Sequence, residues 1–172
     1  LLQQRVPQAA APASDVFRSP AAGALHALVA EHVVQGRVVF PGAAYLETMR
    51  AACSAFGTML VGVALRGVFF LQPLMLASDA TSAVWMECVL QPSASAEVRS
   101  VDEVMQAGEA ASVHCSGTQA AARPEAWTSS VSTDADTNAH GAAVDMGALY
   151  EGMHAAGLQY GPAFRTLECG QV

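Results

Sequence analysis

Basic residues are scarce in this chain of 172 residues, which has eight Lys and Arg against fifteen Asp and Glu and a formal net charge of -7. The few basic residues are scattered along the sequence. A nucleic-acid interface needs clustered basic side chains that neutralise phosphates. We therefore expect no nucleic-acid partner.

Signatures of metal and membrane binding are absent too. The four cysteines, at positions 53, 88, 115 and 169, form no CxxC pair, and a zinc site needs paired ligands at short spacing. We expect free buried thiols in a reducing compartment and a cytoplasmic protein. Because the sequence has neither an unbroken run of 18 apolar residues nor a signal peptide, we expect no membrane association.

What the sequence does have is a large apolar fraction, 52%, although aromatic residues make up only 6%. Alanine dominates that fraction and buries little area, so the core must rest on Val, Leu, Met and Phe. The length fits one domain or a large part of one. Since the chain starts without methionine, we expect it to be a piece of a longer polypeptide.

The N-terminal half predicts a linker, a bend and a long helix. Residues 1–20 are rich in Ala, Pro, Gln and Ser, which is typical of a linker, and we place the domain at 21–172. Apolar β-branched residues at 33–40 predict a strand pair with a tight bend, or one kinked strand. Pro41 and Gly42 then precede a helix over 42–56, capped by Gly57. Its apolar residues fall at helical spacing: Tyr45, Leu46, Met49, Ala52, Cys53 and Phe56.

Strand-like segments follow this helix. They cover residues 59–70, 73–76, 84–90, 98–104 and 110–116. One long buried helix followed by several strands predicts an α+β fold with an antiparallel sheet. Residues 119–143 predict a long loop anchored by Trp127, and Asp145 is the expected N-cap of a short helix that Gly157 ends.

The most specific motif is HxxxGxxxxP, formed by His32, Gly36 and Pro41. It runs directly into Gly42-Ala43-Ala44-Tyr45-Leu46-Glu47 at the start of the predicted helix. This segment resembles the catalytic-histidine motif of dehydratase domains in polyketide synthases and animal-type fatty acid synthases. Further matches occur in the family's order, at residues 65–74, at 113–117 and, as the GYxYGPxF-like segment, at 157–164.

The resemblance implies a hot-dog fold, in which a curved antiparallel sheet wraps around one long central helix. This chain would be one half of a double hot dog. Three differences from the family are visible: Glu31 precedes the histidine in place of an aspartate, Leu158 replaces the first tyrosine of GYxYGPxF, and the opening strands look shortened. The family's catalytic aspartate belongs to the second half, which this sequence does not include.

The implied reaction removes water from a 3-hydroxyacyl thioester on an acyl carrier protein. It needs a base for the α-proton and an acid for the leaving hydroxyl. His32 is the candidate base, because imidazole titrates near neutrality. The thioester carbonyl, where negative charge develops, would lie near Gly36, Pro41 and Gly42 at the helix N-terminus.

The remaining candidate substrate-binding residues are Tyr160, Gly161, Pro162 and Phe164. Tyr160 would line the channel, the Gly-Pro turn would aim it, and Phe164 would belong to the core or the tunnel wall. The resemblance implies no bound cofactor or metal, because the phosphopantetheine arm belongs to the carrier protein. Partners would be that carrier protein, the second hot-dog half and neighbouring synthase domains, and a homodimer of the parent synthase is left open.

Two other interpretations remain open. The chain could be a non-catalytic pseudo-dehydratase kept for architecture, or a related double hot dog that guides polyketide cyclisation, as product-template domains do. The product-template domains share the histidine, and the Tyr160–Phe164 segment favours the dehydratase over them. A single half would expose apolar surface, so we also expect the isolated chain to associate and to lack enzymatic turnover.

Overall fold

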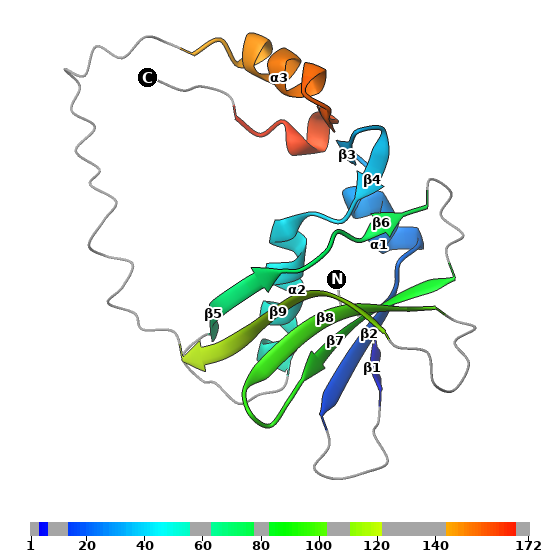
Figure 1. The fold of residues 1–172 in the computed structure, drawn as a ribbon, viewed down its shortest axis with the longest axis vertical. Coiled ribbons are helices and arrows are strands. Elements are labelled where there is room, and N and C mark those ends of the chain that lie inside the picture. Colours follow the sequence, from blue (N-terminus) through cyan, green and yellow to red (C-terminus); the bar gives the residue numbers. More distant parts are fainter. Residues whose placement is uncertain are drawn as a thin grey trace, which may run out of the picture.

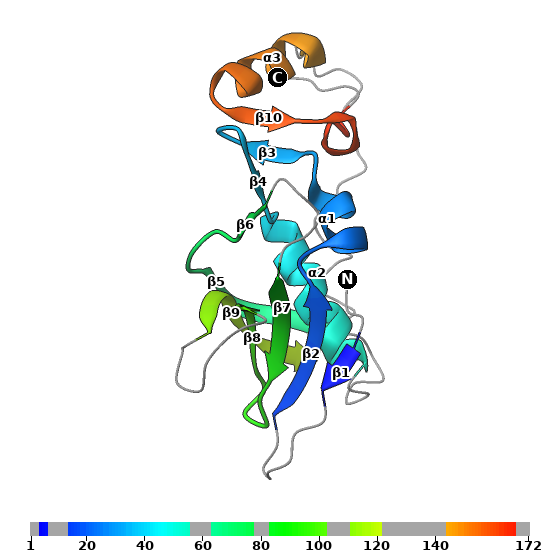
Figure 2. The same ribbon diagram turned by 90° about the vertical axis from the view of Figure 1, so that its right-hand side faces the viewer.

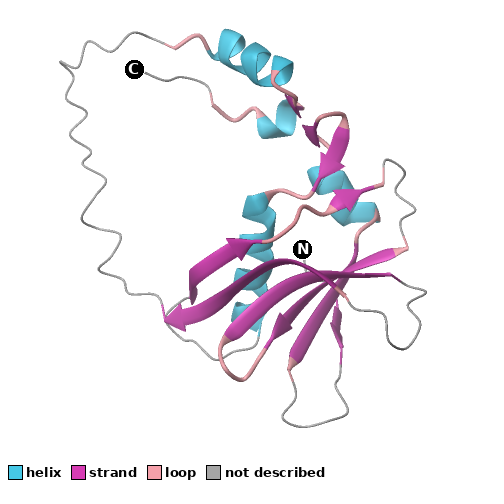
Figure 3. Cartoon of the chain, in the orientation of Figure 1, coloured by secondary structure: helices cyan, strands magenta, loops and turns pink. Residues whose placement is uncertain are grey.

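The computed structural model describes residues 4–6, 14–55, 63–77, 83–102, 111–121 and 144–167. Within them a large antiparallel sheet has the strand order β1-β2-β7-β8-β9-β5 (Figure 1). Its strands are β1 (Gln4–Val6), β2 (Asp15–Pro20), β7 (Val84–Leu90), β8 (Ser95–Asp102), β9 (Ser112–Ala121) and β5 (Val63–Phe70). The sheet curves around one helix, α2 (Gly42–Ala55) (Figure 3).

Helix α2 forms where the apolar spacing predicts it. Tyr45, Met49, Ala52 and Cys53 repeat at helical intervals and are buried against the sheet, with Met49 fully enclosed. Burying one such side chain contributes about 1.5–3 kcal/mol. This arrangement confirms the predicted α+β hot-dog fold. The predicted cap at Gly57 lies outside the described residues.

The core between α2 and the sheet is rich in sulfur. Cys53, Cys88 and Cys115 are buried and free of disulfides, next to Met86 and Val98. Burial raises the pKa of the Cys88 thiol to about 12 and that of the Cys115 thiol to about 11. These cysteines therefore act as small apolar side chains, as predicted; Cys169 lies outside the described residues.

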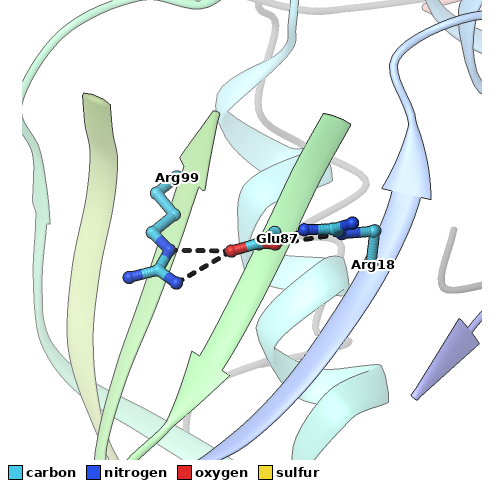
Figure 4. A network of polar contacts seen from close by, with 3 residues as sticks. All are labelled: Arg18, Glu87 and Arg99. Carbon is cyan, nitrogen blue, oxygen red and sulfur yellow. Dashed lines mark hydrogen bonds and ion pairs between the residues drawn. The ribbon is translucent and has the colours of Figure 1, made fainter. Parts of the chain in front are cut away.

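The outer face of the large sheet carries a buried carboxylate. Glu87 on β7 is 3% exposed and accepts hydrogen bonds from Arg18 on β2 and Arg99 on β8, with Nε distances of 3.0 and 2.9 Å (Figure 4). The Arg18 guanidinium also lies over the Trp85 ring. Because both oxygens of the carboxylate are paired, its burial is tolerated. The triad connects three neighbouring strands.

A second, smaller sheet lies at one end of the molecule (Figure 2). Its order is β10-β3-β4-β6, with β10 (Leu158–Tyr160), β3 (His32–Val34), β4 (Arg37–Val39) and β6 (Met75–Leu76). Helix α1 (Gly23–Val29) precedes β3, while α3 (Met146–Ala155) and the short 3-10 helix η2 (Pro162–Phe164) flank β10. Strands β3 and β4 form the bent strand pair that the sequence predicts.

Two sequence predictions need correction. The linker prediction for residues 1–20 is wrong where those residues form strands, because Gln4–Val6 is β1 and Asp15–Pro20 pairs along β7 as β2. Val16 and Phe17 are buried there, so tertiary pairing outweighs the linker-like composition around them. The predicted loop also starts later than residue 119, since β9 continues to Ala121. The rest of that loop, with Trp127, lies outside the described residues.

Candidate active site

The spacing of the histidine motif follows from the β3–β4 hairpin. His32 opens β3, and Val34 pairs with Arg37 across a turn of two residues. Both turn residues have positive φ, 49° at Gln35 and 74° at Gly36, as in the type I′ turns that join strands most tightly. Strand β4 then returns the chain to Pro41, directly before α2. The HxxxGxxxxP spacing thus encodes a strand, a turn, a returning strand and a helix start.

The hairpin also fixes the His32 ring. Its Nδ1 lies 2.7 Å from the carbonyl oxygen of Val39 on the returning strand. A carbonyl only accepts hydrogen bonds, so Nδ1 must carry the proton. In the neutral ring, Nε2 is then unprotonated and is the nitrogen that can accept a proton. The half-buried ring is held in one tautomer suited to a general base.

The GYxYGPxF-like segment meets the histidine motif at this ring. Strand β10 pairs antiparallel with β3 and places Tyr160 opposite His32. The two rings stack with centroids 5.0 Å apart, and the Phe164 ring lies 5.2 Å from His32 in a tilted arrangement. Two aromatic residues from the C-terminal segment therefore lie against the imidazole of His32, far from them in the sequence.

One of these rings, that of Phe164, also lines an apolar hollow of about 350 Å³. Its walls include Pro41 and Ala43 at the start of α2, Leu28 and Val29 of α1, and Phe164. Gly42 and Ala43 are exposed, and the first N–H groups of a helix lack partners within the helix. A positive helix end thus borders an apolar hollow that shares Phe164 with the histidine.

A larger hollow of about 530 Å³ lies elsewhere, between α3 and the segment after η2. Its described walls include Tyr150, Glu151, His154 and Arg165. None of the predicted site residues is among them. The predicted site residues Pro41 and Phe164 line the smaller hollow instead, and the Phe164 ring also contacts His32. We therefore take the smaller hollow as part of the candidate site.

Gly36 is placed differently from the other predicted site residues. It is exposed in the hairpin turn, and its N–H donates to the side-chain Oε1 of Gln159 at 2.7 Å. The neighbouring Gln35 N–H donates to the Gly157 carbonyl. The structure thus gives Gly36 a role in the turn and in its attachment to β10, and its N–H is already engaged.

The sequence pattern marked Glu31 only as a difference from the family and did not indicate Gln159, yet both residues tie the C-terminal segment to the hairpin. Gln159 sits inside the recognised Leu158–Phe164 segment, and Glu31 directly precedes the histidine. Their position next to the two motifs was the available signal.

In the described segments no group of three His, Cys, Asp or Glu side chains could hold a metal ion, and no helix there has the length and apolar character needed to cross a membrane.

Comparison with known proteins identifies the family. The family model of the polyketide synthase dehydratase domain matches residues 1–102, more than half of the chain. This chain belongs to that family. It is 32% identical over 154 residues to the hybrid PKS-NRPS synthetase pynA of Aspergillus niger and 30% identical over 145 residues to the polyketide synthase ThaG of Burkholderia thailandensis.

Each alignment covers 81% of this chain but only 4% and 2% of those very large synthases. Among solved structures, GphF Dehydratase 1 matches with a TM-score of 0.74 and 25% identity, and the dehydratase domain from the CurJ module of curacin polyketide synthase with 0.78 and 21%. Both matches cover 100% of this chain but 58% and 57% of the solved chains. The chain thus spans a little over half of a dehydratase structure.

Proposed function

We propose that this chain supplies the base for dehydration of a 3-hydroxyacyl thioester, presented on the phosphopantetheine arm of an acyl carrier protein. The observation that carries the proposal is the His32 ring, bonded through Nδ1 to Val39 and stacked on Tyr160. This geometry leaves Nε2 as the proton acceptor, and the Phe164 ring that contacts His32 also lines an apolar hollow. Family membership supports the reaction class.

In the proposed reaction, Nε2 of His32 removes the α-proton of the substrate. The electron pair of that C–H bond forms the C2–C3 double bond, and the C3–O bond breaks. The leaving hydroxyl takes a proton from an acid and departs as water, giving the 2-enoyl thioester. The N-terminal end of α2, at Gly42 and Ala43, stabilises negative charge on the thioester carbonyl.

The acid would come from the second hot-dog half. A solved relative, the CurK dehydratase, has inactive variants in which a histidine is replaced by phenylalanine or an aspartate by asparagine. Most of the described Asp and Glu side chains already take part in ion pairs or hydrogen bonds of the fold: Asp15 binds Arg5, Glu47 binds Arg50, and Asp145 caps α3. We infer that the aspartate lies in the part of the dehydratase that this chain does not span.

An exposed apolar strip supports such a partner. Strand β5 is at the edge of the large sheet, and Phe69, Phe70 and Leu71 are 63%, 57% and 58% exposed. Edge strands with large apolar side chains readily pair or associate. The second half would cover this surface, while the carrier protein and neighbouring synthase domains would complete the assembly.

The test is turnover by the complete dehydratase domain that contains this chain. His32→Ala should reduce turnover on the order of a thousand-fold, because base and alignment are lost together. His114→Ala, checked for folding by circular dichroism, should leave turnover largely unchanged. Mass spectrometry of the 3-hydroxyacyl carrier protein measures both. Near wild-type turnover by His32→Ala, or efficient turnover by the 172-residue chain alone, would contradict the roles proposed here for His32 and for the second half. A complete wild-type domain without turnover would favour the architectural or cyclisation roles.

A further inference from the structure

Glu31, the residue before His32, holds the turn that follows Tyr160 at two points. Its backbone carbonyl accepts a hydrogen bond from the Gly161 N–H at 2.9 Å. Its side-chain Oε2 accepts a second from the Ala163 N–H at 2.6 Å. The Phe164 N–H donates to the Gly161 carbonyl at 2.9 Å and closes η2. One residue thus binds both the entry and the middle of the Gly161–Phe164 turn.

Gly161 is needed to make room for this contact. Its φ is -78°, which any residue can adopt, so backbone conformation does not require a glycine. A Cβ at this position would lie 2.7 Å from both the Cβ and Oε2 of Glu31. That separation is too short for any real contact, and the clash with Cβ cannot be relieved by a rotamer change. Space for Glu31 therefore requires glycine at position 161.

The turn carries the two rings that surround the histidine. Tyr160 precedes it and Phe164 ends it, and both lie within 5.2 Å of His32, measured between ring centroids. Because Glu31 is joined covalently to His32 and by hydrogen bonds to the turn, it links the imidazole to both aromatic partners. A carboxylate at the N-terminal end of a helical turn is also favoured by its free N–H groups.

We propose that Glu31 is a positioning residue of this site: it clamps the Gly161–Phe164 turn and so sets Tyr160 and Phe164 against His32. The clamp itself is independent of the reaction, while its effect on turnover rests on the proposed function. A competing role is that Glu31 is itself the acid of the reaction. Gln at this position separates the two roles, because it retains an oxygen acceptor for Ala163 but cannot release a proton.

The experiment compares Glu31→Ala, Glu31→Gln and the control Glu151→Ala, which removes an exposed carboxylate from α3, in the complete dehydratase domain. Hydrogen exchange is followed on a peptide covering 158–165, alongside turnover. Glu31→Ala should speed exchange of that peptide and lower kcat on the order of 10- to 100-fold through misalignment. Glu31→Gln should lose no more than about 3-fold, since a neutral acceptor makes a weaker bond in the same place. Glu151→Ala should match wild type in both readouts.

Gly161→Ala provides an independent variant that leaves Glu31 unchanged. It should reproduce the exchange and turnover of Glu31→Ala, and the double variant should be no worse than the poorer single variant, because both break one contact. Hydrogen exchange of the 158–165 peptide at the wild-type rate in Glu31→Ala would overturn the proposed clamp. A Glu31→Gln enzyme as inactive as Glu31→Ala, with wild-type exchange, would overturn positioning in favour of an acid role. If the wild-type domain shows no turnover, the proposed function fails, and exchange alone still decides the clamp.

Discussion

A histidine on the large sheet and a histidine on the small sheet differ in burial and in hydrogen bonding. His114, on β9 of the large sheet, is 4% exposed, with Nε2 at 2.8 Å from the Ser100 hydroxyl and Nδ1 at 3.2 Å from the Gln72 carbonyl. His32, on the small sheet, is half-buried, and one nitrogen is fixed by Val39. The first ring has both nitrogens in hydrogen bonds within the fold, whereas Nε2 of the second ring is the nitrogen proposed to act as the base.

The same contrast extends to the helices. Helix α2 buries five residues against the large sheet, whereas α3 beside the small sheet buries none of its residues. The segment that brings Tyr160 and Phe164 to His32 is therefore held mainly by β10 pairing and by the Glu31 clamp. The large sheet region supplies stability, and the small sheet region supplies the candidate site at lower local stability. Four sets of variants test this difference in stability between the two regions, from the largest expected effect to the smallest.

Core truncation should distinguish the two regions most strongly. Met49→Ala empties a fully enclosed position on α2 and should lower the free energy of unfolding by about 3 kcal/mol. Met153→Ala, at a half-buried position on α3, should cost well under half as much. Urea unfolding of the complete domain measures both. Equal losses would mean that the small sheet region is as tightly packed as the large one.

Removing the buried carboxylate should have the next largest effect. Glu87→Ala leaves two guanidiniums without their shared partner. Loss of one member of a fully buried pair costs about 3–5 kcal/mol; because the two arginine side chains are 32% exposed, water offsets part of this and about 2 kcal/mol is expected. Glu47→Ala, which removes the exposed partner of Arg50, is the matched control and should not measurably change stability. A Glu87→Ala protein with wild-type stability would show that the triad is dispensable.

His114 should make stability depend on pH. Burial lowers its pKa in the folded state, against weaker opposing hydrogen bonds. As pH falls below the unfolded value of about 6.5, the unfolded chain takes up a proton that the folded chain resists, so stability declines. His114→Gln should flatten this decline relative to wild type. Denaturant unfolding at a series of pH values measures the slope, and an identical slope in His114→Gln would refute the assignment.

The smallest effect concerns the cap of α3. Asp145 accepts a hydrogen bond from the Ala148 N–H at 3.1 Å, as the sequence predicts for an N-cap. Asp145→Ala should weaken the helix locally by about 1 kcal/mol and speed hydrogen exchange in 146–155. Global unfolding, set by the large sheet region, should hardly change, with Asp102→Ala at the end of β8 as the control. A clear global loss in Asp145→Ala would show that the two regions unfold together.

The sequence alone determined those elements that rest on local rules. The apolar spacing of Tyr45, Met49 and Cys53 gave α2, and Gln35-Gly36 gave the bend between β3 and β4, since helical periodicity and turn conformation depend on neighbouring residues. The resemblance supplied His32, Tyr160 and Phe164 as candidates for one site. Their catalytic roles stay predictions until turnover is measured.

Only the tertiary structure decided how distant segments meet. Asp15–Pro20 is a strand because it pairs along β7, and nothing in its linker-like surroundings encodes that partner. Likewise, the stacking of Tyr160 on His32 and the clamp from Glu31 to Ala163 follow from the register of β10 on β3. Register is fixed by hydrogen bonds and packing between strands far apart in the chain. Local sequence therefore specified the histidine hairpin, and long-range pairing completed the site around it.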